Sequence, residues 1–450
     1  MARLDLSKNY NIMATMLRWL SNATSLEYLD LSGCGSLTVE PPQVALGALI
    51  NLKGLDLSSN SLEGDILGIL SNVSGGGLKH LDLSQNYFTG TITRIVRSLR
   101  HLQHLDLSDN SNVAGHVPDL LGNLTSLRHL SLRDNNLIDG EIPPTMGHFV
   151  RLEHLDLSHT RITGDVPSSI GNLSDLVYLD LAGCSITGQI PPSVGNLTER
   201  EYLDLSSNDV VGSIPETIGS MVHLETLNLF DNSVAGQLPE TMGRLRRLKS
   251  LDIADNKLSG QLPTAMGDLC NLTLLDLSYN NIAGDLTDLL RGLSTCSRGS
   301  SLLSLFMKDN NLSGIIPSSM GQLSQLEYLF LSSNSLVGNI TEAHFSNLTK
   351  LFEFTIVSNS LNVILPNDWL PPFSVFFIDM SSCHIGAKFP DWIQTQQELH
   401  SLYLSGVGLS GSLPAWFSDF SKGLQDLDMS SNNLTSTSLV FGFLERLARS

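Results

Sequence analysis

The sequence predicts an α/β solenoid, in which short parallel strands from successive coils form one long concave sheet. Two observations predict it. The apolar pattern L-x-x-L-x-L-x-x-N recurs along the 450 residues, at spacings of 24 to 26 residues with one spacing of 30. A second pattern, L-x-G-x-I-P, follows many of the predicted strands. Because repetition at this period is typical of stacked coils, we expect residues 1–450 to form a single solenoid.

Seventeen coils can be aligned on the first pattern, and an eighteenth begins at Met1. The coils start at Leu26, Leu52, Leu78, Leu102, Leu127, Leu152, Leu176, Arg200, Leu224, Leu248, Leu272, Leu302, Leu326, Leu351, Val375, Leu399 and Leu424. One coil cannot bury its own leucines, but stacked coils share an apolar core and pair their strands into a parallel sheet.

Asparagine recurs at the last position of the pattern, just after the strand. An inward-pointing amide there can bond backbone groups that would otherwise be buried without a partner, so we interpret these residues as structural. They are Asn60, Asn86, Asn110, Asn135, Asn208, Asn232, Asn256, Asn280, Asn310, Asn334, Asn359 and Asn432.

The period and the pattern together are those of leucine-rich repeats. The second pattern occurs as Ile142-Pro143, Ile190-Pro191, Ile214-Pro215 and Ile316-Pro317. With it the chain resembles the plant-specific leucine-rich repeat, whose coils twist into a superhelix with a second short sheet. We therefore expect a plant-type leucine-rich-repeat superhelix of about 17 to 18 coils, with an irregular long coil at 272–301.

Several segments are similar to plant receptor-like proteins of the xylanase-elicitor-receptor and apple-scab-resistance type. They are Leu269–Leu272 with Cys296, Trp369–Phe373, Ser382-Cys383, Phe389–Trp392 and Pro414–Phe417. Proteins of this kind begin with a signal peptide and a cysteine-bearing cap and continue to a membrane span. The signal peptide, the caps and the membrane span are not found in this sequence, so we interpret the chain as a fragment or a truncated gene product.

The resemblance implies the ligand-binding ectodomain portion of a plant cell-surface receptor. Such a protein recognises an extracellular protein, peptide or glycan in defence or developmental signalling, and its partner is a co-receptor kinase. The full-length form is expected at the extracellular face of the plasma membrane. Two alternatives stay open, the ectodomain of a receptor kinase and a secreted inhibitor of microbial wall-degrading enzymes.

Composition and motifs argue against other classes. The formal net charge is −19 with only 26 Lys and Arg residues, so no basic field exists for binding nucleic acid. The sequence has no G-x-S-x-G, no H-E-x-x-H and no set of kinase motifs, and we expect neither an enzyme nor a cofactor. Arg200 stands where leucine is expected, and we interpret it as a local flaw whose side chain snorkels to an edge.

Five cysteines fall into two groups. Cys34, Cys184 and Cys383 occupy the ladder position at separations of six and eight coils, or roughly 29 and 38 Å at ~4.8 Å per strand. A disulfide needs Cα atoms within about 7 Å, so these three are expected to be single thiols. Cys270 and Cys296 flank one coil and resemble a cysteine pair of the receptor-like proteins. We expect them to form a disulfide, with two free thiols as the alternative.

Ten N-x-S/T sequons mark expected glycosylation sites. They are Asn22, Asn72, Asn123, Asn172, Asn196, Asn271, Asn311, Asn339, Asn347 and Asn433. Five of them lie four residues before a strand, so their glycans would line one flank of the solenoid. The alternative is that N-L-T and N-L-S merely suit the turn into the strand.

Strand residues alternate, so the positions beside each buried leucine face solvent and form a grid. One column of this grid is mostly aspartate in the N-terminal half. Beside it, His80, His104, His129 and His154 occupy four successive strands. We expect them to contact a ligand and to change charge around pH 5 to 7, with plain polar surface as the alternative. A flat row does not converge on one ion, so no metal site is expected.

The grid becomes aromatic in the segment 302–410. The rings expected to contact ligand are Phe306, Tyr328, Phe330, Phe352, Phe376, Phe377 and Tyr403. Five strands at ~4.8 Å make a patch roughly 20 Å across, which is large for apolar surface on a soluble protein. The alternative is that the rings fold sideways and merely cover the sheet.

Overall fold

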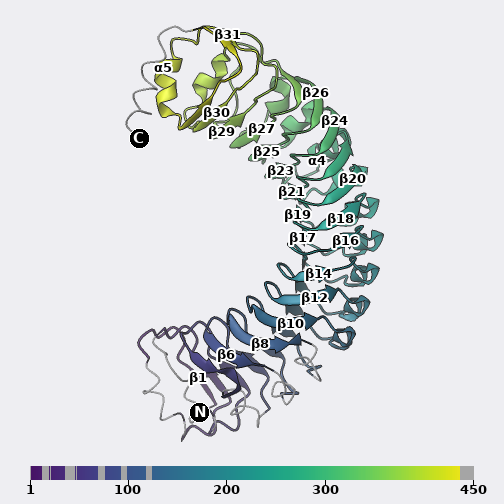
Figure 1. Cartoon of the computed structure of the whole chain (residues 1–450), viewed down its shortest axis with the longest axis vertical. Coiled ribbons are helices and arrows are strands. Elements are labelled where there is room, and N and C mark those ends of the chain that lie inside the picture. Colours follow the sequence, from purple (N-terminus) through teal and green to yellow (C-terminus); the bar gives the residue numbers. More distant parts are fainter. Residues whose placement is uncertain are drawn as a thin grey trace. The chain divides into compact units, whose positions relative to one another are not determined.

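The computed structural model describes residues 2–12, 20, 22–35, 46, 48–68, 77–92, 99–117 and 124–435. Tertiary contacts divide the chain into two units, Met1–Ser233 and Val234–Ser450. In each unit, successive coils place their strands side by side (Figure 1). The sequons at Asn72 and Asn123 lie outside the described residues.

The first sheet of the N-terminal unit consists of three-residue parallel strands paired without a shift in register, so that His80 lies beside His104 and His104 beside His129. Its strands are β1 (Arg3–Asp5), β2 (Tyr28–Asp30), β3 (Gly54–Asp56), β5 (His80–Asp82), β7 (His104–Asp106), β9 (His129–Ser131), β11 (His154–Asp156), β13 (Tyr178–Asp180), β15 (Tyr202–Asp204) and β17 (Thr226–Asn228). Each position of the repeat therefore forms a straight column across the sheet.

The first sheet of the C-terminal unit has the same parallel construction, and Phe306 lies beside Phe330. Its strands are β19 (Ser250–Asp252), β21 (Leu274–Asp276), β23 (Ser304–Phe306), β25 (Tyr328–Phe330), β27 (Glu353–Thr355), β29 (Phe377–Asp379), β30 (Ser401–Tyr403) and β32 (Asp426–Asp428). The expected parallel sheet of strands from successive coils is confirmed in both units.

A second set of parallel strands follows the L-x-G-x-I-P pattern. In the N-terminal unit these are β4 (Glu63–Asp65), β6 (Tyr87–Thr91), β8 (Asn112–His116), β10 (Leu137–Glu141), β12 (Arg161–Asp165), β14 (Ser185–Thr187) and β16 (Val211–Gly212). Further along the chain they are β18 (Ser233–Gly236), β20 (Lys257–Gln261), β22 (Asn281–Gly284), β24 (Asn311–Ile315), β26 (Ser335–Ile340), β28 (Ser360–Val363), β31 (Ser410–Gly411) and β33 (Asn433–Leu434). The glycine of the pattern is required by the backbone, since Gly260 has a φ of +78° and a Cβ there would lie 2.5 Å from Cγ of Gln237.

Short helices complete the coils, and most begin directly after the proline of the pattern. The 3₁₀ helices are η3 (Pro144–His148), η4 (Ser168–Asn172), η5 (Pro192–Asn196), η6 (Glu216–Ser220), η7 (Glu240–Arg244), η8 (Thr264–Asp268), η9 (Ser318–Gln322), η10 (Glu342–Phe345), η11 (Asp391–Thr395) and η12 (Ser421–Gly423). Two α-helices, α4 (Thr287–Ser294) and α5 (Phe417–Phe420), occur in the C-terminal unit. The irregular coil 272–301 is long because it contains α4, which buries Leu289, Leu290 and Leu293. No helix in the described ranges is long and apolar enough to span a bilayer.

The asparagine ladder is confirmed. Asn110 is fully buried, and its Nδ2 donates to the carbonyl oxygens of Leu83 at 2.9 Å and Leu107 at 3.2 Å. Its Oδ1 accepts from the backbone N–H of Phe88 at 3.1 Å. Cysteine takes the same place in three coils, and Cys184 Sγ lies 3.2 Å from the carbonyl oxygen of Leu157. The coils are thus joined through backbone groups that would otherwise be buried unpaired.

Arg200 departs from the interpretation of the sequence. Its side chain is 0% exposed, and none of its guanidinium nitrogens has a hydrogen-bond partner among the described residues. Burial lowers the pKa of Arg200 to about 9. The expectation that it snorkels to an edge was wrong, because the position belongs to the inward-facing leucine set and packed coils enclose the side chain.

Candidate functional site

The solvent-facing side of the first sheet carries the candidate binding residues. In β5 the central Leu81 is fully buried, while His80 and Asp82 on either side are half-buried. The same alternation holds in β23, where Leu305 is buried and Phe306 is half-buried. The inward and outward positions expected from the strand period are therefore confirmed.

The four histidines form a continuous stack of rings, which we call the histidine ladder. Ring centroids are 4.1 Å apart between His80 and His104, 4.1 Å between His104 and His129, and 4.2 Å between His129 and His154. The stack continues to Tyr178 at 4.2 Å, and Tyr178 stacks on Tyr202 at 4.4 Å. Register pairing of the strands, repeated at one column, places these rings face to face.

The aspartates beside the ladder have a structural task. Asp106 Oδ1 accepts hydrogen bonds from the backbone N–H of Ser108 at 2.9 Å and from its hydroxyl at 2.7 Å. Asp82 does the same with Ser84, at 3.0 and 2.7 Å. These bonds close the turn that follows each strand. They account for the recurrent L-D-L-S sequence without a ligand.

Burial shifts the protonation of this surface. It lowers the pKa of His80, that of His104 to about 3 and that of His154 to about 4. It raises the pKa of Asp82 to about 6 and that of Asp180 to about 6. The expectation that the whole ladder changes charge around pH 5 to 7 was therefore wrong for His104 and His154, because partly enclosed, stacked imidazoles resist a second like charge.

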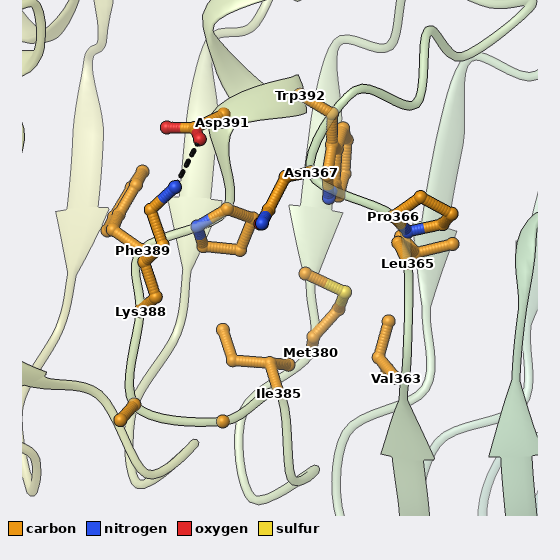
Figure 2. A pocket seen from close by; sticks show the side chains of 13 residues that line it. Val363, Leu365, Pro366, Asn367, Met380, Ile385, Lys388, Phe389, Asp391 and Trp392 are labelled. Atoms are coloured by element: carbon orange, nitrogen blue, oxygen red, sulfur yellow. Dashed lines mark hydrogen bonds and ion pairs between the residues drawn. The ribbon is translucent and has the colours of Figure 1, made fainter.

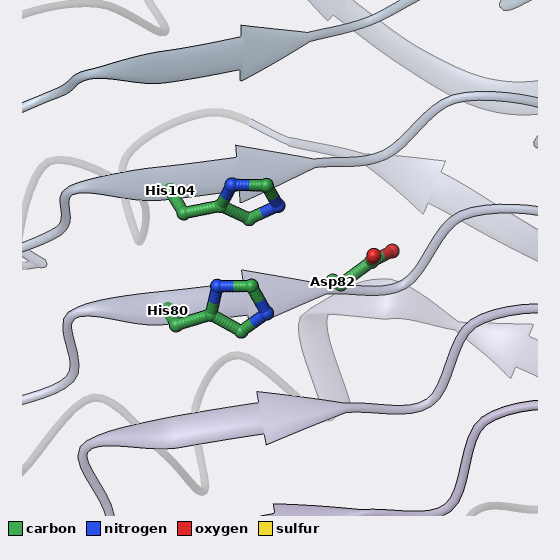
Figure 3. A group of neighbouring side chains, drawn as sticks. All are labelled: His80, Asp82 and His104. Atoms are coloured by element: carbon green, nitrogen blue, oxygen red, sulfur yellow. The ribbon is translucent and has the colours of Figure 1, made fainter. Parts of the chain in front are cut away.

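Neighbouring strands bring metal-ligating atoms together. The ligand atoms of His80, Asp82 and His104 lie within 4.8 Å of one another, as do those of His104, Asp106 and His129. Figure 3 shows the first group, with two imidazoles on adjacent strands and the carboxylate beside them. The expectation that a flat row does not converge overlooked the aspartate column, which adds a ligand beside each pair of rings.

The seven rings expected to contact ligand are all at the surface of the first sheet of the C-terminal unit, and we call them the aromatic surface. Phe352 is 38% exposed and the other six are half-buried. Phe306 and Phe330 lie 4.9 Å apart between centroids, and Phe377 and Tyr403 lie 5.5 Å apart. The rings therefore touch one another and still present apolar area to solvent.

A second row of the aromatic surface runs beside the first. Tyr328 contacts Phe352 edge-on at 6.0 Å, and Phe352 stacks on Phe376 at 5.2 Å. His400 extends this row by stacking on Phe376 at 4.6 Å. Sequence reasoning missed His400, although it occupies the same repeat position as Phe376.

A cavity that sequence reasoning also missed lies in the C-terminal unit. It has a volume of about 230 Å³ and is lined by Val363–Asn367, Met380 and Ile385–Trp392, apart from Ile364 (Figure 2). An ion pair of 2.6 Å between Lys388 Nζ and Asp391 Oδ2 lies at its wall. Its volume is below the roughly 300 Å³ at which pockets for small molecules begin, so we assign it no ligand.

The cysteines and the described sequons lie outside the strands of the first sheet. A disulfide joins Cys270 to Cys296, with Cα atoms 5.7 Å apart, whereas Cys34, Cys184 and Cys383 are free. The sequon asparagines that the structure describes are all exposed, namely Asn22, Asn172, Asn196, Asn271, Asn311, Asn339, Asn347 and Asn433. None of these eight lies in a strand of the first sheet.

The chain belongs to the leucine-rich-repeat family. A family model described as "Leucine-rich repeat region" matches residues 84–209, 179–296 and 216–447. A second model, "Leucine Rich Repeat", matches residues 51–73. The fold class predicted from the repeat period is thereby confirmed.

Curated relatives are plant receptor-like proteins. Receptor-like protein EIX2 of Solanum lycopersicum is 41% identical over 98 residues, which are 22% of this chain and 10% of that protein. Receptor-like protein 1 of Arabidopsis thaliana is 30% identical over 141 residues, which are 31% of this chain and 13% of that protein. The matches thus span only about a tenth of the relatives' length. The resemblance drawn from the sequence motifs is confirmed.

Solved structures of plant receptor ectodomains share the fold. The Arabidopsis receptor kinase HAESA, in complex with the peptide hormone IDA and the co-receptor SERK1, gives a TM-score of 0.83 at 30% identity, covering 96% of this chain and 70% of that chain. A TDR receptor gives a TM-score of 0.83 at 27% identity, covering 96% of this chain and 77% of that chain.

Proposed function

We propose that this chain is the ligand-binding ectodomain portion of a plant cell-surface receptor-like protein. Its ligand is an extracellular peptide or protein, bound on the aromatic surface, and its full-length form acts at the plasma membrane together with a co-receptor kinase. The observation that carries the proposal is the set of seven partly exposed rings, arranged in two rows on one sheet face.

Aromatic side chains dominate binding energy because they bury large apolar areas at low entropic cost. In β19, for comparison, the same two positions carry the small or polar residues Ser250 and Asp252. A repeat built only for stability gains nothing from replacing these by half-exposed Phe and Tyr. Exposed apolar patches of this kind typically mark interaction sites.

The comparisons support a receptor ectodomain and are compatible with two kinds of receptor, a receptor-like protein and a receptor kinase. HAESA binds a peptide hormone and a co-receptor in its solved complex, which favours a peptide ligand and a co-receptor for this chain. The sequence relatives are receptor-like proteins, whereas HAESA is a receptor kinase, so a kinase ectodomain is the second candidate. Sequencing the full-length transcript distinguishes the two candidates. A membrane span followed by kinase motifs would indicate a receptor kinase, and a membrane span followed by a short tail would indicate a receptor-like protein.

Peptide selection tests the proposal. Binders are selected from a displayed random peptide library against the chain secreted from plant cells, and their affinities are measured for Phe306→Ala, Phe330→Ala, Phe352→Ala and Phe377→Ala. We expect losses of about 1 to 3 kcal/mol at two or more positions with a nearly unchanged Tm. Tyr87→Ala removes an exposed ring of β6 in the second sheet and serves as the matched control. Unchanged affinity in all four variants would place the binding site elsewhere.

A further inference from the structure

Two ring nitrogens of the histidine ladder lack a hydrogen-bond partner. The Nε2 atoms of His104 and His129 are both inaccessible to solvent, and neither makes a hydrogen bond to any residue that the structure describes. Buried polar atoms are nearly always satisfied by protein, water or an ion. These two nitrogens lie on adjacent strands, and their rings stack at 4.1 Å. The two nitrogens are therefore candidate ligand atoms for one shared metal ion.

A carboxylate completes the set. Asp106 Oδ1 is held by both hydrogen bonds from Ser108, at 2.9 and 2.7 Å, and this fixes the orientation of the carboxylate. Its other oxygen, Oδ2, lies 3.7 Å from His129 Nε2. That distance is too long for a hydrogen bond and suits two ligands of one ion. The three ligand atoms lie within 4.8 Å of one another.

We propose that His104, Asp106 and His129 bind one divalent transition-metal ion, with zinc as the probe. Two imidazoles and one carboxylate form a set that suits zinc, copper or nickel, whereas magnesium and calcium prefer oxygen ligands alone. The acidic column adds to the attraction, because Asp156 lies on the neighbouring strand β11. Coordination gives both orphaned nitrogens a partner.

Binding requires a small movement of the rings. Zinc takes nitrogen ligands at about 2.0 to 2.1 Å and carboxylate oxygens at about 2.0 to 2.2 Å, so the three atoms must draw together. In the parallel stack the ring lone pairs run side by side, and the imidazoles must turn toward each other. The χ2 torsion of histidine is broad, which makes this rotation cheap. The ladder face is partly exposed, so a fourth position stays open to water or to a ligand side chain.

His104 also belongs to the neighbouring group with His80 and Asp82 (Figure 3). The two groups share His104, and two divalent ions bound this close together would repel each other, so we expect only one group to be filled. We assign the ion to the group with Asp106, since it holds both orphaned nitrogens. The stoichiometry is therefore one ion per chain.

Isothermal titration of the untagged full chain with Zn²⁺ at pH 7.5 tests this site. We expect one saturable ion in the wild type, and a loss of affinity of about tenfold or more in His104→Gln and in Asp106→Asn. Asp106→Asn keeps an oxygen for the Ser108 bonds. His154→Gln, a ladder member outside both groups, and Asp82→Asn, which alters only the other group, are matched controls with unchanged affinity.

A second readout guards against misfolded variants. Circular dichroism of each variant must match the wild type, and Zn²⁺ should raise the Tm of the wild type and of both controls but not of His104→Gln. No saturable binding by the wild type overturns the site, as does undiminished affinity in His104→Gln. If Asp82→Asn weakens binding and Asp106→Asn does not, the assignment to Asp106 is wrong. The result is independent of the peptide-binding proposal, because no variant touches the aromatic surface.

Discussion

Single side chains decide which buried polar groups of a coil are satisfied. Asn110 succeeds because one amide has both donors and an acceptor, and it uses them on four backbone groups of its own and the preceding coil. The guanidinium of Arg200 has five donors and no acceptor within reach in the described structure. Asn110 and Arg200 are both buried, but only the polar atoms of Asn110 have hydrogen-bond partners.

Replacing Arg200 tests this contrast. An uncompensated buried charge costs several kcal/mol, so Arg200→Leu should raise the free energy of unfolding by about 3 kcal/mol and the Tm by about 3 °C. Differential scanning calorimetry at pH 7.5 measures the change. Arg151→Leu, at an exposed arginine near another coil start, is the control and should give no gain. A Tm that stays the same or falls in Arg200→Leu would show that the guanidinium is satisfied in solution.

Asp180 predicts a pH dependence of stability. Its Oδ1 accepts from the backbone N–H of Ala182 at 3.0 Å and its Oδ2 from the Tyr178 hydroxyl at 3.1 Å, yet burial still raises its pKa to about 6. Because the folded pKa lies above the unfolded value, this carboxyl adds stability below pH ~4 that is lost as pH rises through ~6. Asp156 and Asp204, on the two adjacent strands, act in the same direction.

Asp180→Asn should remove this dependence. The variant is expected to be about 1 to 2 kcal/mol more stable than the wild type at pH 7.5 and equal to it at pH 4. Urea unfolding at both pH values, followed by circular dichroism, gives the comparison. Equal stability of the two proteins at pH 7.5 would contradict the raised pKa.

At the scale of elements, the strands could be predicted and the turns between them only in part. Each L-x-L strand repeats with a side chain period of two and a coil period near 24, so both its position and its outward residues follow from the pattern. The helix α4 was not foreseen, although Leu286, Leu289, Leu290 and Leu293 have helical spacing. When the coils are aligned on the repeat pattern, only the extra length of this coil is visible.

The candidate sites were predictable where their residues occupy the same repeat position in successive strands of the first sheet. The histidine ladder and the aromatic surface follow from strand register, which sets neighbours at a fixed repeat position. The cavity beside Trp392 does not, because it forms where the second sheet is interrupted and only an isolated bridge joins Asn362 to His384. Arg200 was misjudged because the repeat pattern does not show whether packed coils leave a long polar side chain a path to the surface.

The disulfide Cys270–Cys296 fastens the coil that contains α4. It spans 26 residues in sequence, and closing such a loop stabilises the folded chain by ~3 kcal/mol in the chain-entropy model. The double variant Cys270→Ser/Cys296→Ser should lose about this much stability, as seen in a lower midpoint of urea unfolding. Cys184→Ser, at a free ladder thiol, is the comparison and should behave alike with and without reductant. An unchanged midpoint in the double variant, or both cysteines alkylated in non-reducing peptide maps, would contradict the prediction.

At the scale of the whole molecule, the sequons and the candidate binding surfaces occupy different parts of the coil. Asn172 and Asn196 end the helices η4 and η5, and Asn311 and Asn339 lie in β24 and β26 of the second strand set. The first-sheet strands carry no sequon. Glycans on the natural sites would therefore leave the first sheet open to a ligand. A glycan placed within it should block binding.

Glu353→Asn creates such a site, because Phe354 and Thr355 follow it in β27. Glu353 pairs with Tyr328 on one side and Phe377 on the other, so a sugar chain there covers the middle of the aromatic surface. Secreted from plant cells, this variant should lose at least about tenfold in affinity for the selected peptides through steric exclusion. Glu353→Gln, which creates no sequon, should bind like the wild type. Enzymatic removal of the glycan should restore binding in Glu353→Asn, whereas full affinity of the glycosylated variant would show that the peptides bind outside this sheet.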